Sequence, residues 1–350
     1  MATQQKPTYS TAFLIIGALF VIWGILGVLD QPNVPYSGYS ATNNTVTRIY
    51  PGSPAEQAGL RVGDHITSIG GISVQDSRAR RQRERAVIGS TRTFIVEPRL
   101  GAAGAPSASR SVDITYTALP GRDSALRYAS FIIGLCFVVW PLGAYLKVVG
   151  KSATLLALVG LCLSIGSFSG PYFSSYFLRL LANSVSIIII LLGFACLLHL
   201  MLEFPKRSAF LAKAHALKIV YGPAALIALF VLYFIIFSPL PTSTPNPLAI
   251  ALIVIFLVAY FGLPAIAMVR SFVKATPEER SDHGLNFLLA AILIVLIPLT
   301  FAILIGIFAP RMVLPGSDFY SLTVVLVPIA LAMAVRKKTT PPTAARVAVE

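Results

Sequence analysis

Long apolar stretches separated by short polar loops make up most of this chain, and one polar stretch of domain size interrupts them near the N-terminus. A helix that crosses a lipid bilayer needs about 20 mostly apolar residues. Stretches of this kind fall at residues 12–29, 128–146, 152–168, 176–202, 217–237, 248–269, 285–308 and 319–335. The pattern therefore predicts eight transmembrane helices, of which the first is separated from the other seven by the polar stretch.

The composition agrees with a membrane protein. Of the 350 residues, 56% are hydrophobic and 12% are charged, whereas about a quarter of the residues in a soluble domain are charged. The net charge is +14, but the basic residues lie mostly at the ends of the apolar stretches and form no single patch interleaved with aromatic residues. We therefore expect membrane lipids, and not nucleic acid, among the partners of the chain.

The positions of Lys and Arg predict the orientation of the helices. Short cytosolic loops carry an excess of these residues, and a cytosolic N-terminus places Lys206, Arg207 and most other loop cations on the cytosolic side. The short outer loops then hold only Arg179 and Arg311. An even number of helices returns the C-terminus to the cytosol, so we expect a multi-pass protein of the cell (inner) membrane with both termini cytosolic.

These observations divide the chain into four parts. Residues 1–30 are expected to form an uncleaved signal-anchor helix, because no small-x-small cleavage site follows the apolar run. Residues 35–118 form the inserted domain, which lies outside the cytosol because long domains are translocated largely regardless of their charge. Residues 128–335 form a seven-helix membrane bundle, and residues 336–350 a disordered cytosolic tail.

Local signals in the polar stretch predict an α+β domain. The β-branched run at residues 45–50 is typical of a strand. Ser53, Pro54 and Glu56 form the capping-box signature of a short helix, and Gly59 suits the left-handed residue that ends such a helix. Further strands are expected at residues 65–69, 72–74, 91–98 and 110–116, and a further helix at residues 77–88.

One part of this domain resembles a known family. The sequence PGSPAEQAGL at residues 51–60, followed by Gly63-Asp64 and by Ile69-Gly70-Gly71, is similar to a PDZ domain. PDZ domains bind extended peptides by adding a strand to a sheet edge, and a loop of backbone N–H groups holds the C-terminal carboxylate. The resemblance implies an extracytoplasmic PDZ domain whose partner is a peptide or protein C-terminus outside the cytosol.

The same resemblance places the ligand site on one loop and one helix. In the predicted loop, Gly38 permits close approach of the backbone to the ligand and Tyr39 lines an apolar pocket. The residues of this loop are Tyr36, Ser37, Gly38, Tyr39 and Ser40.

The predicted helix at residues 77–88 forms the other wall of the ligand groove. Its Arg78, Arg81 and Arg85 share one face at helical spacing. This basic face fits an acidic peptide or anionic headgroups near the outer surface, or it is simply a solvated charged face.

The sequence shows no pattern of catalytic or metal-binding residues. None of the four histidines begins the HExxH motif of a site-2-type zinc protease, and Cys136, Cys162 and Cys196 lie in apolar stretches without a CxxC pair. The spans also lack the mid-membrane ionisable residues typical of transporters. We expect no cofactor, no metal, no catalytic residue and no enzymatic activity.

His199 and Glu203 lie one helical turn apart at the end of the fourth span. They form either a switchable pair with signalling consequences or an interfacial anchor pair, since long polar side chains often reach out of the membrane at the ends of spans.

A second resemblance concerns the helices. The sequence LLHLMLEFPKR at residues 197–207, with VPIALAMAVR at residues 327–336, looks like the seven-helix sensory region of bacterial signalling proteins. Competence quorum-sensing histidine kinases and membrane SpoIIE-type phosphatases resemble this layout, and they continue into a kinase or phosphatase domain that has no counterpart here. The resemblance implies a sensor that relays ligand binding through the bundle to a separate cytosolic signalling partner.

Two other functional classes stay open. The chain is alternatively a non-signalling membrane scaffold or adaptor that tethers envelope proteins through its PDZ domain. A third class is a transporter accessory or a lipid-handling protein.

Overall fold

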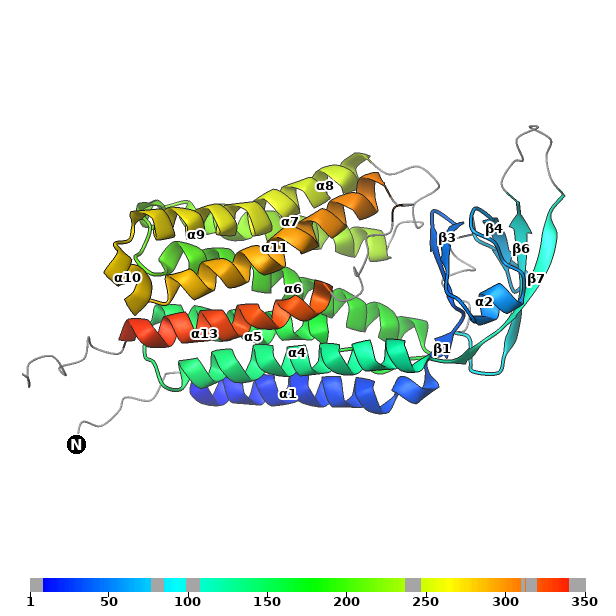
Figure 1. Ribbon diagram of the computed structural model, residues 1–350, viewed down its shortest axis with the longest axis horizontal. Helices are drawn as coiled ribbons and strands as arrows, with labels where there is room; N and C mark the ends of the chain where they lie inside the picture. Colours follow the sequence, from blue (N-terminus) through cyan, green and yellow to red (C-terminus); the bar gives the residue numbers. More distant parts are fainter. Residues whose placement is uncertain are drawn as a thin grey trace, which may run out of the picture.

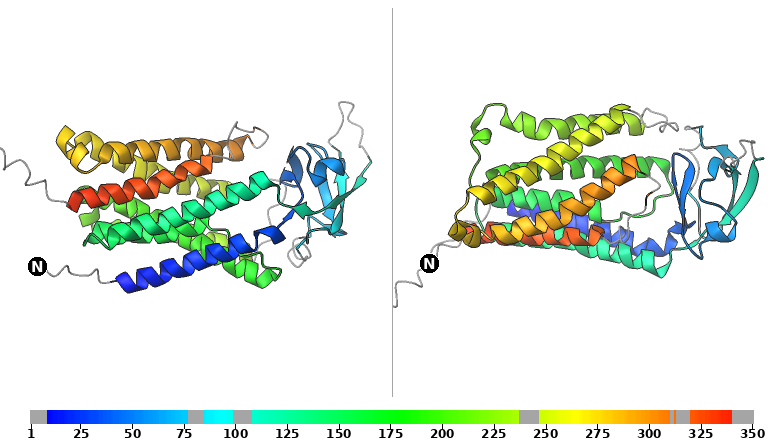
Figure 2. Two further views of the ribbon diagram at one scale, coloured as in Figure 1. Left: turned by 60° about the horizontal axis from the view of Figure 1, so that its bottom comes forward. Right: turned by 45° about the horizontal axis from the view of Figure 1, so that its top comes forward.

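A computed structural model describes residues 9–76, 85–98, 108–236, 247–309, 312 and 320–339. They form a small β-rich domain and an elongated helical region, and the domain lies at one end of the helices in Figure 1 and in both views of Figure 2. Helix α1 (Ser10–Leu29) leads into the domain, and α4 (Gly121–Tyr145) leads back from it. The domain is therefore an insertion between two helices of the helical region.

The domain is built on an antiparallel sheet with the order β2-β3-β4-β6-β7. Alternate residues of its strands face one side and form the core, in which Val46, Ile66, Phe94 and Ile114 are buried. The strands are β2 (Tyr39–Thr42), β3 (Thr45–Ile49), β4 (His65–Ile69), β6 (Thr91–Glu97) and β7 (Arg110–Thr115), with β5 (Ile72–Ser73) paired to β4.

Turn chemistry places helix α2 (Pro54–Gln57) against this sheet. The Ser53 hydroxyl accepts a hydrogen bond from the Glu56 backbone N–H, which confirms the predicted cap, and Pro54 occupies the first turn. The Glu56 carboxylate accepts from the Gly52 N–H at 2.6 Å and not from the Ser53 N–H, so the predicted capping box is displaced by one residue. Gly59 has a φ of +81°, as a residue that ends a helix in the left-handed region requires.

Both ends of the domain meet at one point. Strand β1 (Pro35–Tyr36) pairs with β8 (Thr117–Ala118), and a short 3-10 turn η1 (Gln31–Asn33) joins β1 to α1. The Gln31 side-chain amide also donates to the Ser124 carbonyl in the first turn of α4, at 3.2 Å. The domain is thus closed on itself where it joins the helices.

The helical region contains six helices, among the residues described, that are long and apolar enough to cross a membrane. Helix α4 packs against α1, α5 and α13. Helix α6 packs against α5, α7 and α9, and helix α11 packs against α9 and α13. The remaining elements are α5 (Lys151–Ser167), α6 (Tyr176–Glu203), η2 (Ala209–Ala212), α7 (Ala216–Ile236), α8 (Pro247–Leu257), a π-helical segment η3 (Val258–Gly262), α9 (Leu263–Lys274), α10 (Pro277–Asp282), α11 (Leu285–Phe308), η4 (Ser321–Val325) and α13 (Leu326–Thr339).

The π segment between α8 and α9 has an identifiable cause. Pro264 follows it and cannot donate a backbone hydrogen bond, so the preceding turn widens. The Tyr260 hydroxyl from this turn bridges α7, because it donates to the Val220 carbonyl at 2.9 Å and accepts from the Ala224 N–H at 2.7 Å. This contact fixes where α8 and α9 lie relative to α7.

Several predicted boundaries differ from the structure. α4 already begins at Gly121 and not near residue 128, because Pro120 sets the start of the helix and Asp123 lies in its first turn, where an acidic group is favourable. The last predicted span is divided between the 3-10 turn η4 and α13, and α13 continues to Thr339, so residues 336–339 are helical and not part of a disordered tail. The Lys337 ammonium donates to the Ser281 carbonyl at 3.5 Å, which holds this last turn.

A buried ion pair holds the domain together. Asp64 is buried, and its carboxylate accepts from the Arg110 guanidinium at 2.5 Å and from the Arg61 N–H at 2.8 Å. The same guanidinium donates to the Gly59 carbonyl at 2.9 Å. Arg110 therefore connects β7 to the turns on both sides of residue 60.

We predict that Arg110→Ala lowers the free energy of unfolding of the domain by about 3 kcal/mol, because it leaves the Asp64 carboxylate buried without its counter-ion. The measurement is urea denaturation of a fragment spanning residues 31–123. Arg61→Ala is the matched control. Its exposed side chain makes no contact that the fold needs, so its effect stays within about 0.5 kcal/mol. Equal losses from the two substitutions would contradict the assigned role of the ion pair.

Candidate functional site

The predicted ligand loop, residues 36–40, is held by the segment that starts α2. The Ser37 carbonyl accepts from the Ala55 N–H at 2.9 Å. The Gly38 carbonyl accepts from the Tyr50 N–H and from the Ser53 hydroxyl, each at 3.0 Å. The loop therefore has one fixed backbone conformation, which is what a backbone binding site requires.

Position 38 of this loop requires glycine for two reasons. Its φ is +79°, a region that L side chains rarely adopt. A Cβ atom on Gly38 would also lie 2.0 Å from the Ser53 Cβ. The close approach of the loop to Ser53 therefore requires glycine.

The aromatic residues of the loop pack inward. Tyr39 is half-buried and its ring meets the Phe94 ring edge-on at a centroid distance of 5.8 Å. Tyr36 packs near Tyr50 at 6.5 Å, and burial raises the pKa of Tyr36. Tyr39 thus packs on the core of the domain.

The predicted loop is shorter in the structure, because Tyr36 belongs to β1 and Tyr39 and Ser40 already belong to β2, which lies at the edge of the sheet. Strand β2 pairs with β3 on one side, with Tyr39 opposite Ile49 and Ser40 opposite Arg48, and the register shifts between Ser40 and Ala41. On its other side no described strand pairs with it. An edge strand of this kind accepts an added peptide strand through its backbone groups.

The second wall of the groove falls mostly on residues outside the described ranges, and these include Arg78 and Arg81. The predicted helix does not extend to residue 88, because the described residues from Arg85 onward are not helical. A turn replaces it: the Ser90 hydroxyl donates to the Val87 carbonyl at 2.6 Å, and the Gly89 N–H donates to the Tyr116 carbonyl at 2.7 Å.

Arg85 does not join the residues of the loop 36–40. Its guanidinium carbon lies 4.0 Å from the ring centroid of Tyr172, which belongs to the connection between α5 and α6 in the helical region. This is a cation–π contact between the domain and the helical region. Burial lowers the pKa of Arg85, and the pKa of Tyr172 is raised, also by burial.

Tyr172 makes two further contacts across the same boundary. Its hydroxyl donates to the Ala86 carbonyl at 3.2 Å, and its backbone N–H donates to the Asp30 carboxylate, at the end of α1, at 2.5 Å. We call Asp30, Arg85, Ala86 and Tyr172 the Tyr172 junction. It connects the domain, α1 and the α5–α6 connection at one place.

Aromatic residues next to Tyr172 fix this connection to the helices. Phe168 packs where Gly24 of α1 and Gly134 of α4 leave space, since a Cβ on either glycine would lie 2.6 Å or 2.5 Å from its ring. Trp23 and Phe173 pack with ring centroids 5.8 Å apart. The sequence showed this connection only as an uncharged turn, and its aromatic residues were the signal that could have indicated a contact surface.

At the opposite end of the helical region, His199 and Glu203 do not bond to each other. The His199 Nδ1 atom lies 3.0 Å from the Tyr221 hydroxyl. The Glu203 carboxylate lies 3.4 Å from Lys151 and 4.0 Å from Arg207. The two residues share a helix face as predicted, but each has its own partners.

Comparison with known proteins identifies the domain. A PDZ domain is recognised at residues 45–80. Over 54 residues the chain is 41% identical to the Na(+)/H(+) exchange regulatory cofactor NHE-RF2 of Oryctolagus cuniculus, which covers 15% of this chain and 17% of that relative. No solved structure matches the chain.

The class defined by fold and comparison is a PDZ domain joined to a helical region whose described residues include six helices long and apolar enough to cross a membrane. PDZ domains bind peptide C-termini. The recognised range begins at Thr45, so the role of residues 36–40 stays a prediction. The resemblance of the helices to bacterial sensory regions is not confirmed, because the family match lies within the domain.

We predict that Gly38→Ala lowers the free energy of unfolding by about 3 kcal/mol, because a left-handed alanine costs about 1 kcal/mol or more and the new methyl group collides with Ser53. Gly71→Ala is the matched control. Gly71 has a similar φ of +75° but nothing within 4 Å of an added Cβ, so its cost is about 1 kcal/mol. Denaturation of the fragment 31–123 gives both values, and equal values would contradict the close contact of Gly38 with Ser53.

Proposed function

We propose that this chain is a multi-pass membrane protein that binds a peptide or protein C-terminus through an extracytoplasmic PDZ domain. Eight helices span the membrane in this proposal. α5 has 17 residues, and η4 and α13 have 5 and 14 residues in one continuous stretch, against about 17–25 residues for a helix that spans a membrane. The two elements outside the six long apolar helices are therefore also long enough to span the membrane.

The observation that carries the binding function is the edge strand β2, which starts at the fixed loop 36–40. An extended peptide adds antiparallel to β2, and its carboxylate lies at the backbone N–H groups of the loop. Gly38 supports this role because its left-handed backbone and its close contact with Ser53 hold the loop in one conformation.

We predict that the fragment 31–123 binds a peptide ending in a free carboxylate at least about tenfold more tightly than the same peptide ending in an amide. A charge-assisted hydrogen bond contributes about 1.5–3 kcal/mol, and about 1.4 kcal/mol corresponds to a tenfold change in affinity. A library of extracytoplasmic C-terminal sequences, screened by fluorescence anisotropy, measures this ratio. Equal affinity for acid and amide would exclude carboxylate capture by the loop.

The relay of ligand binding to the helices is the second part of the proposal. The Tyr172 junction supports it, since Arg85 and Ala86 belong to residues 77–88, the segment predicted as the second wall of the groove. A ligand that moves this segment changes the contacts of Tyr172, and the rigid α5–α6 connection transmits the change to α1, α5 and α6. The cytosolic loops at residues 203–218 and 270–283 then report it to a separate partner.

We predict that ligand saturation changes amine-reactive labelling of Lys206 and Lys213 in the full chain, and that Tyr172→Ala abolishes this change without weakening ligand binding. Lys206 is suited to the measurement, because its 2.7 Å ion pair with Glu279 bridges the two cytosolic loops. Tyr128→Ala removes an exposed tyrosine of α4 and serves as the control. Labelling of the parent chain that does not respond to saturating ligand would exclude the relay.

A scaffold function is the second candidate. The match to a protein named as a regulatory cofactor favours it. In this case α1 with the domain, residues 1–123, suffices for function in cells, and α4 to α13 serve only as an anchor. Neither candidate assigns an enzymatic activity, a cofactor or a metal to the chain.

A further inference from the structure

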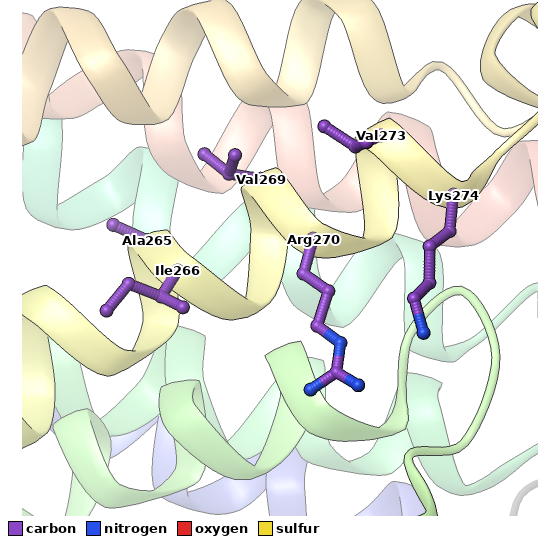
Figure 3. Close-up of a pocket in the computed structure, with 6 residues that line it drawn as sticks. All are labelled: Ala265, Ile266, Val269, Arg270, Val273 and Lys274. Atoms are coloured by element: carbon purple, nitrogen blue, oxygen red, sulfur yellow. The ribbon is translucent and has the colours of Figure 1, made fainter.

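The surface of α9 carries a groove of about 440 Å³ that no part of the proposed function uses. It runs between two rows of side chains, and neighbours within each row are one helical turn apart. One row is Ala265, Val269 and Val273, and the other is Ile266, Arg270 and Lys274 (Figure 3). Its lining is apolar, since Arg270 and Lys274 contribute their aliphatic stems and their charged ends extend beyond the groove.

The apolar part of the groove is exposed on the helix surface. The exposed fractions are 62% for Ile266, 41% for Val269 and 67% for Val273. In water such a strip favours burial against another apolar surface. At the membrane location proposed above, on which this inference rests, the adjacent surface is lipid.

Arg270 and Lys274 have no structural task within the described part of the protein. They point to the same side of α9 in Figure 3, and neither forms an ion pair or a hydrogen bond with a described residue. The end of α9 is instead capped by Arg280, whose guanidinium donates to the Phe272 and Ala275 carbonyls at 3.0 and 3.1 Å. The adjacent acidic residue Glu279 is occupied by Lys206.

The length of the groove matches one lipid leaflet. From Ala265 to Lys274 the helix rises about 14 Å, and half of a hydrocarbon core is about 15 Å. Lys274 is the last residue of α9, and the charged helix α10 (Pro277–Asp282) begins three residues later, so the cations lie at the level of lipid headgroups. An acyl chain along Val269 and Ile266 then has its headgroup beside two cations.

We propose that this groove binds one anionic phospholipid of the cytosolic leaflet, with its phosphate at Arg270 and Lys274 and an acyl chain along Ile266 and Val269. A planar guanidinium and an ammonium one turn apart suit phosphate oxygens, since arginine binds them in bidentate geometry and lysine acts as a point charge. A zwitterionic lipid fills the apolar part but gains less at the cationic end. This site also places a bound lipid directly before the cytosolic loop that the relay would use.

The test is lipid retention by the full chain in detergent micelles, measured by native mass spectrometry during titration with dioleoylphosphatidylglycerol or dioleoylphosphatidylcholine. We expect one phosphatidylglycerol to be retained preferentially. The double variant Arg270→Gln/Lys274→Gln weakens its retention about 25-fold, from about fivefold for each cation, and weakens the retention of phosphatidylcholine much less. The charge-preserving swap Arg270→Lys/Lys274→Arg retains the preference.

Lys213→Gln/Lys218→Gln is the matched control, because it removes two exposed cations from the same end of the helical region and leaves the groove intact. Equal retention of the two lipids, or equal loss in both double variants, overturns the proposal. A dimer that is lost together with Arg270 and Lys274 also overturns it, because the groove would then bind a second copy of the chain. Peptide binding by fragment 31–123 is independent of these results, so failure of the lipid site and failure of the PDZ function are distinguishable.

Discussion

The close packing of α1 against α4 is the contact on which the arrangement of the whole chain depends. Glycines on one face of α1 allow it, because a Cβ on Gly17 would lie 3.0 Å from Leu142 of α4 and one on Gly24 would lie 3.0 Å from Phe131 of α4. The two helices hold the ends of the domain together, and the β1–β8 pair closes the domain at this point. Any movement of the domain therefore acts first on α1 and α4.

The local structure of the domain could be predicted from the sequence, because glycine, proline and capping residues determine its turns. Ser53, Pro54 and Gly59 form the expected short helix, and the strand at residues 65–69 is found as predicted. Contacts between distant parts of the chain carry no such local signal. Arg85 lies near a basic run, yet its partner Tyr172 is far away in sequence, so composition alone favoured a ligand-binding role for Arg85.

The candidate site was predictable in part for the same reason. Gly38 precedes a strand and suggested close approach of a ligand to the backbone, which stays a prediction, whereas the structure shows that the contact with Ser53 requires glycine there. The inward packing of Tyr39 was not predictable, because its partner Phe94 lies on a strand that is remote in sequence. The ends of helices were also not predictable from hydropathy. The start of α4 depends on Pro120, and the end of α13 depends on the contact of Lys337 with Ser281.

In the proposed relay, the contacts of the Tyr172 junction supply one part of the coupling between ligand binding and the helices, beside the direct connections of the domain to α1 and α4. A partly buried cation–π contact contributes about 1 kcal/mol and a hydrogen bond about 1 kcal/mol. If the contacts of Arg85 and Ala86 are present in one state of the bundle and absent in the other, the two states differ by about 2 kcal/mol. This difference lies within the usual range for allosteric coupling and changes the equilibrium between the two states about 30-fold. Shifting the populations of two bundle states from 1:99 to 99:1 would need about 5.5 kcal/mol. The junction thus suits a bundle whose two states are already similar in free energy, and a second ligand at the cytosolic end, such as a lipid beside Arg270, could set that starting balance.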